Sequence, residues 1–318
     1  MIEYILLNLL LFVYVVLISI EFGNSIYYYI YSKRDINLSK IIFGYISPIW
    51  ELTNTVLVLF IVFLIGIYPK APMLYGTVLI VPVSLALMFL MIRAFSFVYL
   101  YEYDESSITF RTLYALCSLF IPIFLSTYFS VSIYNNIHQV GGSIIYSLSR
   151  IFFSPLSLAF MIFAVLNIIY LSSAFLLMYT KKDKKIIEEV SHIFIILSSI
   201  MLIFVSISFF IFQNLPFFNN ILNNYFLILF LYLLLFVLSQ GLLIFKEYRN
   251  IFSFSLLQMF LLFLMYVFGN YPYIMYNNIS IFNINSPLVI QVLLYVSIIA
   301  LIISIPALIV FIYFIKRK

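Results

Sequence analysis

An acidic residue stands deep inside an apolar stretch of this chain. Glu51 lies in the run 41–68, which is long enough to cross the hydrocarbon core of a bilayer, roughly 30 Å thick, as a helix of about 20 residues. Counted from the basic loop that ends at Lys40, at about 1.5 Å per residue, Glu51 is roughly 15 Å deep and close to the midplane. An ionisable group at that depth is costly and indicates a functional site.

Polar and aromatic residues accompany this acid. Trp50, the only tryptophan of the chain, precedes Glu51, while Asn54 and Thr55 follow at the three- and four-residue spacings that place side chains on one helical face. We therefore expect Glu51 to head a polar stripe within the membrane.

Two further charged residues lie at a similar depth. Glu21 is about ten residues from the end of the run 2–31, and Arg93 is about eight residues, or roughly 12 Å, from the same face in the run 73–101. If these runs are neighbouring helices, Arg93 can pair fully with only one of the two carboxylates, and the other is free to hold a proton. That arrangement suits a proton relay. The alternative is a buried Glu–Arg pair that only fixes helix register.

The composition is that of a polytopic membrane protein. Hydrophobic residues make up 66% of the chain and charged residues 8%, with a mean hydropathy of +1.20, against roughly 25% charged residues in ordinary soluble domains. None of the apolar runs alternates with the period of two that a barrel strand requires, so we expect helices. The nine runs cover residues 2–31, 41–68, 73–101, 107–134, 151–180, 186–212, 222–245, 251–275 and 287–315.

The basic residues predict the orientation of these helices. Of the 16 Lys and Arg residues, Lys70 and Arg150 fall on one face and Arg93 within a run. The positive-inside rule therefore places the N-terminus outside and the C-terminus in the cytoplasm, and the net charge of +5 reflects topology rather than nucleic-acid binding. The other face holds Lys33, Arg34, Lys40, Arg111, Lys181, Lys182, Lys184, Lys185, Lys246, Arg249, Lys316, Arg317 and Lys318.

The chain offers little that could bind a metal or a haem. Cys117 is the single cysteine, which excludes an intrachain disulfide and a Cys-based metal site. A haem in a helical bundle usually takes His or Met ligands from facing helices, but His138 falls in an outer loop and His192 near the cytoplasmic end of its run. The ten methionines are possible ligands, although methionine is more often a packing residue. We expect no haem ligated by this chain alone. No soluble-enzyme motif is present either, so any chemistry is expected in another chain.

Three motifs in the first hundred residues carry a resemblance to a known family. Residues 21–23 (Glu-Phe-Gly), 47–51 (Ser-Pro-Ile-Trp-Glu) and 93–97 (Arg-Ala-Phe-Ser-Phe) resemble the helix motifs of subunit II of cytochrome bd-type quinol oxidases: an acid near a glycine, G-P-x-W-[DE], and F-R-x-x-x-[FY]. The similarity continues in the second half with Ser154-Pro155-Leu156, Tyr271-Pro272-Tyr273 and Asn285-Ser286-Pro287.

This resemblance implies an all-α polytopic membrane protein of nine transmembrane helices. Within the single membrane domain 1–318, it implies one four-helix bundle in residues 1–134, a second in 151–275, and a peripheral helix in 287–315. The implied partner, in the cell membrane, is a homologous subunit I that carries the b- and d-type haems and the quinol site and reduces O₂ to water. A small single-helix accessory subunit is left open.

The resemblance also implies roles for individual residues. Trp50 and Glu51 match the motif that lines the family's proton route from the cytoplasmic side, Glu21 matches the acidic position of the first helix, and Arg93 matches the arginine of the third, for which we expect a charge-pairing role. Asn54 and Thr55 remain a polar stripe deduced from spacing alone.

Two other functions are alternatives to the hypothesis that this chain is an oxidase subunit. A proton-coupled secondary transporter would bind its coupling proton at Glu51 and Glu21, although the runs lack matching Gly/Pro breaks and the chain has only eight glycines. An assembly scaffold would leave the intramembrane acids without a role.

Overall fold

A computed structural model describes most of the chain, apart from residues 1, 104–106, 134–150 and 180–183 and much of the segment after 276. The described residues are 2–103, 107–133, 151–179, 184–276, 279–282, 284–285, 289, 291–293 and 295–296. Within them, eight helices are long and apolar enough to cross a membrane. The ninth predicted helix, 287–315, falls almost wholly outside the described residues, as does His138.

The elements follow one another as helices with one small sheet near the end. They are α1 (Ile2–Tyr31), α2 (Ile36–Ile67), α3 (Lys70–Val78), α4 (Ile80–Glu102), α5 (Ile108–Leu125), α6 (Thr127–Ile133), α8 (Pro155–Tyr179), α9 (Lys184–Phe212), α10 (Pro216–Asn224), α11 (Phe226–Ile244), α12 (Tyr248–Asn270), β1 (Tyr273–Met275) and β2 (Ile279–Ser280).

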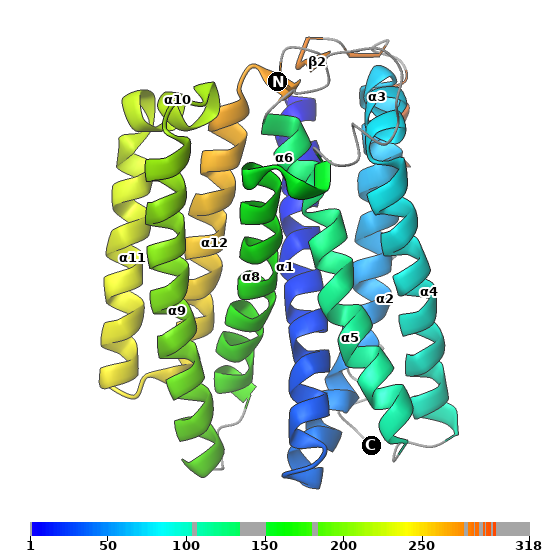
Figure 1. Cartoon of the computed structure of the whole chain (residues 1–318), viewed down its shortest axis with the longest axis vertical. Coiled ribbons are helices and arrows are strands. Elements are labelled where there is room, and N and C mark those ends of the chain that lie inside the picture. Colours follow the sequence, from blue (N-terminus) through cyan, green and yellow to red (C-terminus); the bar gives the residue numbers. More distant parts are fainter. Residues whose placement is uncertain are drawn as a thin grey trace.

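The long helices run side by side, with α1 near the middle of the molecule (Figure 1). Helix α1 contacts α2 and α5 on one side and α8 on the other. Helix α4 packs on α5, while α8, α9, α11 and α12 contact one another in the second half. The short helices α3, α6 and α10 lie with the sheet at the end of the molecule that carries the N-terminus (Figure 1). The division into two bundles, the total of nine helices and the orientation of the termini stay predictions.

Several apolar runs do not form single helices. The run 107–134 is divided at Ser126 between α5 and α6. The run 73–101 is divided at Leu79 between α3 and α4, and Pro82 in the first turn of α4 has no N–H with which to bond the preceding turn. The run 222–245 is divided at Tyr225 between α10 and α11. The run 251–275 leaves the helical state after Asn270 and forms β1, which pairs antiparallel with β2, so the all-α prediction missed this two-stranded sheet.

Helix α8 begins with a serine and a proline that suit a helix start. Ser154 precedes the helix, and its Oγ accepts a hydrogen bond from the backbone N–H of Ser157 at 3.2 Å, while Pro155 is the first helical residue. This is the pairing of an N-cap serine with a proline at the first position, where a missing N–H costs nothing.

Close packing joins α1 to α8. A Cβ atom at Gly23 would collide with the carbonyl oxygen of Ile168 and the side chain of Ser172, so only glycine permits this approach. One turn before, the Nδ2 of Asn167 donates to the Oγ of Ser19 at 3.0 Å. The contact between α1 and α8 therefore fixes the two halves of the molecule against each other.

Buried tyrosines form hydrogen bonds at the end of the molecule that carries the sheet. The Tyr75 hydroxyl on α3 donates to the carbonyl oxygen of Ile274 in β1 at 3.0 Å, and Ser132 and Tyr266 share a hydrogen bond of 2.9 Å between their hydroxyls. Burial raises the pKa of the Tyr75 phenol well above its ordinary value, so that the group remains a donor.

Candidate functional site

A buried ion pair joins α1 to α4. The Nη1 of Arg93 lies 2.5 Å from the Oε1 of Glu21, and each side chain is 1% exposed. The two residues were expected at the same depth, and the structure brings them together. The partner that Arg93 takes is thus Glu21.

Neutral groups complete the surroundings of the guanidinium. The Nε of Arg93 donates to the Oγ of Ser118 at 2.8 Å, and Nη2 donates to the Oγ of Ser25 at 3.1 Å and to the hydroxyl of Tyr114 at 2.9 Å. The rings of Phe22 and Tyr114 lie 4.3 Å and 4.6 Å from its Cζ atom. A planar cation held by a carboxylate, three hydroxyls and two rings has a fixed position.

Helical spacing explains how these hydroxyls are aimed. Ser25 follows Glu21 by four residues and donates its proton to the Glu21 carbonyl oxygen at 2.9 Å. Ser118 follows Tyr114 by four residues and donates to its carbonyl oxygen at 2.7 Å. Each serine hydroxyl therefore donates its hydrogen bond within its own helix and accepts one from Arg93 through its oxygen.

Sequence reasoning missed these neutral partners. The four-residue spacing between Glu21 and Ser25 was a usable signal, because it places both on one helical face. Tyr114 and Ser118 carried no such signal, since they reach Arg93 only through the packing of α5 on α4.

Glu51 stands apart from this pair. Its side chain is exposed on the surface of α2, and so are those of Asn54 and Thr55. The hydroxyl of Thr55 donates to the Glu51 carbonyl oxygen at 2.9 Å. These three side chains are therefore exposed near the middle of a span that runs from Leu38 to Ile67, and their role as a polar stripe stays a prediction.

Aromatic rings lie between the stripe and the ion pair. The indole of Trp50 is half-buried, and its centroid lies 5.5 Å from that of Phe97 on α4. The Phe97 ring lies in turn 5.8 Å from the ring of Tyr114, which contacts Arg93. A single ring therefore separates Trp50 from the surroundings of the buried pair.

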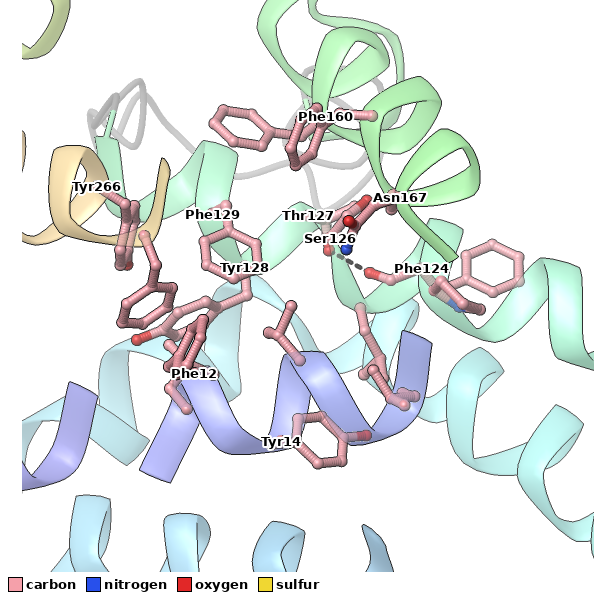
Figure 2. A pocket seen from close by; sticks show the side chains of 18 of the residues that line it. Phe12, Tyr14, Phe124, Ser126, Thr127, Tyr128, Phe129, Phe160, Asn167 and Tyr266 are labelled. Atoms are coloured by element: carbon pink, nitrogen blue, oxygen red, sulfur yellow. Dashed lines mark hydrogen bonds between the residues drawn. The ribbon is translucent and has the colours of Figure 1, made fainter. Parts of the chain in front are cut away.

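The helices also enclose a pocket that none of Glu21, Glu51 and Arg93 lines. A pocket of about 640 Å³ is walled by helices from both halves of the molecule, and no charged residue lines it in the described part of the chain. Because its lining includes no Asp or Glu, this pocket offers no acid for proton chemistry. Figure 2 labels some of its lining residues: Phe12, Tyr14, Phe124, Ser126, Thr127, Tyr128, Phe129, Phe160, Asn167 and Tyr266.

Potential metal and haem ligands are sparse in the described residues. They contain no group of three or more His, Cys, Asp or Glu side chains that could hold a metal ion. His192 is exposed on α9, and Cys117 is buried on α5. The expectation that this chain alone ligates no haem stays a prediction.

The chain is similar to known proteins along its whole length. Residues 1–315 match the family model described as cytochrome bd terminal oxidase subunit II. A stretch of 166 residues is 32% identical to the "Putative cytochrome bd menaquinol oxidase subunit II" of Bacillus subtilis (strain 168), covering 52% of this chain and 48% of that relative, about half its length. A chain of the bd oxidase from Geobacillus thermodenitrificans superposes with a TM-score of 0.84 and 26% identity, covering 100% of both chains.

Proposed function

Because this chain belongs to the cytochrome bd terminal oxidase subunit II family, we propose that it is the haem-free subunit of a bd-type quinol oxidase in the cell membrane. Its partner is a homologous subunit I, whose b- and d-type haems supply the redox chemistry of quinol oxidation and O₂ reduction. This chain supports that subunit and supplies protons from the cytoplasmic side. Family membership does not favour the proton-coupled transporter.

The exposed position of Glu51 carries this proposal. The residue lies near the middle of a membrane span, and apolar residues such as Val58 (59% exposed) and Ile61 (44% exposed) continue the surface of α2 beyond the stripe. An acidic side chain facing lipid at the midplane costs about 2.5–3.5 kcal/mol or more. A protein partner that covers Glu51 and hydrogen-bonds it removes that cost. We therefore infer that the stripe Glu51, Asn54 and Thr55 faces subunit I.

The two acids have different parts in the proposed proton path. Glu21 is buried and engages Arg93 through Oε1, so we assign it a buried step of the route, at its second carboxylate oxygen. No salt bridge to Glu51 is recorded among the described residues, and we assign this residue the uptake and release of protons at the subunit boundary. Trp50 is half-buried against Phe97, and we assign its indole ring a place in the lining of the route.

Substitution of Glu51 tests this assignment. In the purified two-subunit complex, Glu51→Gln keeps the shape and hydrogen-bonding capacity of the side chain but cannot carry a proton, so quinol oxidase turnover should fall by about tenfold or more. The matched control is Glu102→Gln, which changes an exposed glutamate at the end of α4 and should leave turnover unchanged. Wild-type turnover in Glu51→Gln, at wild-type haem content, would refute the proton path.

A further inference from the structure

An asparagine near the ion pair has no partner for its side chain. Asn24 on α1 is 0% exposed, and neither its Nδ2 nor its Oδ1 has a hydrogen-bond partner among the described residues. Native proteins satisfy nearly all of their buried polar groups, through protein atoms or ordered water. Inside a membrane an unsatisfied amide is especially costly, so this side chain requires an explanation.

The spacing of Asn24 connects it to Glu21. The two residues are three positions apart on one helix, where Cβ atoms lie about 5–6 Å from each other. The Oε2 of Glu21 is also buried without a hydrogen-bond partner among the described residues. The ion pair with Arg93 is made through Oε1, and the hydrogen bonds recorded for the guanidinium go to the hydroxyls of Ser25, Ser118 and Tyr114, not to Oε2.

Two buried tyrosines follow Asn24 along α1, toward the end of the helix that we expect to face the cytoplasm. Tyr27, one turn beyond Asn24, is 2% exposed, and Tyr31, one turn farther, is 4% exposed at the last residue of α1. Polar side chains thus occur on four successive turns, from the carboxylate of Glu21 to the phenol at the helix end.

We propose that Asn24 is a positioning residue that holds water against the second carboxylate oxygen of Glu21. Carboxylate oxygens only accept hydrogen bonds, whereas an asparagine amide both donates and accepts. A water molecule can accept from Nδ2, donate to Oε2 of Glu21 and use its remaining proton toward Oδ1 or the next water, which is the two to four bonds that buried waters typically make. Asn24 then extends the proton route from Glu21 toward Tyr27. This inference rests on the proposed function, because it gives Asn24 a role in the same path.

Two substitutions of Asn24 separate water binding from packing. Asn24→Leu keeps the volume but removes both polar atoms, whereas Asn24→Ser keeps a hydroxyl and leaves room for water. In the purified haem-containing complex, Asn24→Leu should lower turnover by about tenfold and shift its pH profile, and Asn24→Ser should recover turnover to within about threefold of wild type. The matched control, Asn167→Leu, removes another buried asparagine, which already bonds Ser19, and should keep the wild-type pH profile.

Infrared difference spectroscopy on reduction of the same complexes gives the second readout. A water O–H band that shifts in H₂¹⁸O should be present in wild type and Asn24→Ser and absent in Asn24→Leu, and the Glu21 carboxyl band, identified with Glu21→Gln, should move with it. If Asn24→Leu does not assemble, Asn24→Ala takes its place with the same expectations.

Wild-type turnover, pH profile and water band in the apolar variant would overturn the inference. Loss of turnover in Glu51→Gln beside that result would leave the proposed function standing, whereas full turnover in Glu51→Gln would remove the proposed function itself.

Discussion

Removal of the Arg93 side chain should destabilise the protein more than removal of the whole ion pair. Arg93→Met replaces a fully buried cation with an apolar chain of similar length. It leaves the Glu21 carboxylate buried without its cation, and the hydroxyls of Ser25, Ser118 and Tyr114 lose a shared donor. Breaking a buried pair by removing one partner costs about 3–5 kcal/mol, because an uncompensated charge remains.

The double variant Arg93→Met/Glu21→Gln isolates that cost. It removes both charges, and replacing a buried pair as a whole is often close to neutral. With about 2 °C per kcal/mol for a chain of this size, the single variant should lower the melting temperature by roughly 6–10 °C, and the double variant should recover most of that loss. Arg34→Met, which changes an exposed arginine between α1 and α2, is the control and should shift the free energy of unfolding by less than about 0.5 kcal/mol.

Thermal unfolding of the purified complex, followed by fluorescence and by loss of haem absorption, measures these differences. A double variant as unstable as the single one would mean that the charge of Glu21 is not what makes Arg93 necessary. A single variant as stable as wild type would mean that the pair is not buried in the assembled protein. Either result would refute the account of the Glu21–Arg93 site.

Three further predictions concern packing and the sheet end of the molecule. Gly23→Ala should weaken the contact between α1 and α8 and lower the melting temperature, because its Cβ would collide with Ile168 and Ser172. Tyr75→Phe should cost about 1 kcal/mol of unfolding free energy, because it removes the donor to Ile274. Stability should also fall as pH rises above 10.0, the ordinary pKa of tyrosine, since burial raises the Tyr75 pKa in the folded state and the unfolded chain loses its proton first. Tyr75→Phe should reduce this alkaline loss.

Matched variants check these three predictions by thermal unfolding. Gly76→Ala adds the same methyl group where no atom lies within 4 Å, so its melting temperature should match wild type, and equal shifts for Gly23 and Gly76 would contradict the close contact. Tyr103→Phe changes a tyrosine that is 80% exposed and should have little effect at any pH. An alkaline loss of the same size in Tyr75→Phe and in wild type would assign that loss to other groups.

The depth of charged residues was readable from the sequence, but their partners were not. Counting residues from the loops placed Glu21 and Arg93 in one layer, because helical rise converts sequence position into depth. Which carboxylate takes the arginine depends on how α1 and α4 are rotated about their axes. In a chain that is apolar on most sides, the sequence does not encode that rotation strongly, so Ser118 and Tyr114 could not be identified.

The same limit applies to Glu51 and to the ends of the helices. Spacing placed Glu51, Asn54 and Thr55 on one face but could not tell whether that face points into the chain or out of it. Apolar runs likewise predicted the positions of the spans, but not the break at Leu79 or the return of the chain through β1 and β2. Continuous hydrophobicity fixes membrane location, whereas local backbone groups such as the missing N–H of Pro82 decide where a helix stops.

A reduced-minus-oxidised visible spectrum of the complex purified through a tag on this chain tests the central claim most directly. We expect haem bands of the b and d types, together with a second integral subunit that retains the haems when the two chains are separated. A haem-free preparation that contains this chain alone would contradict its role as subunit II of a quinol oxidase.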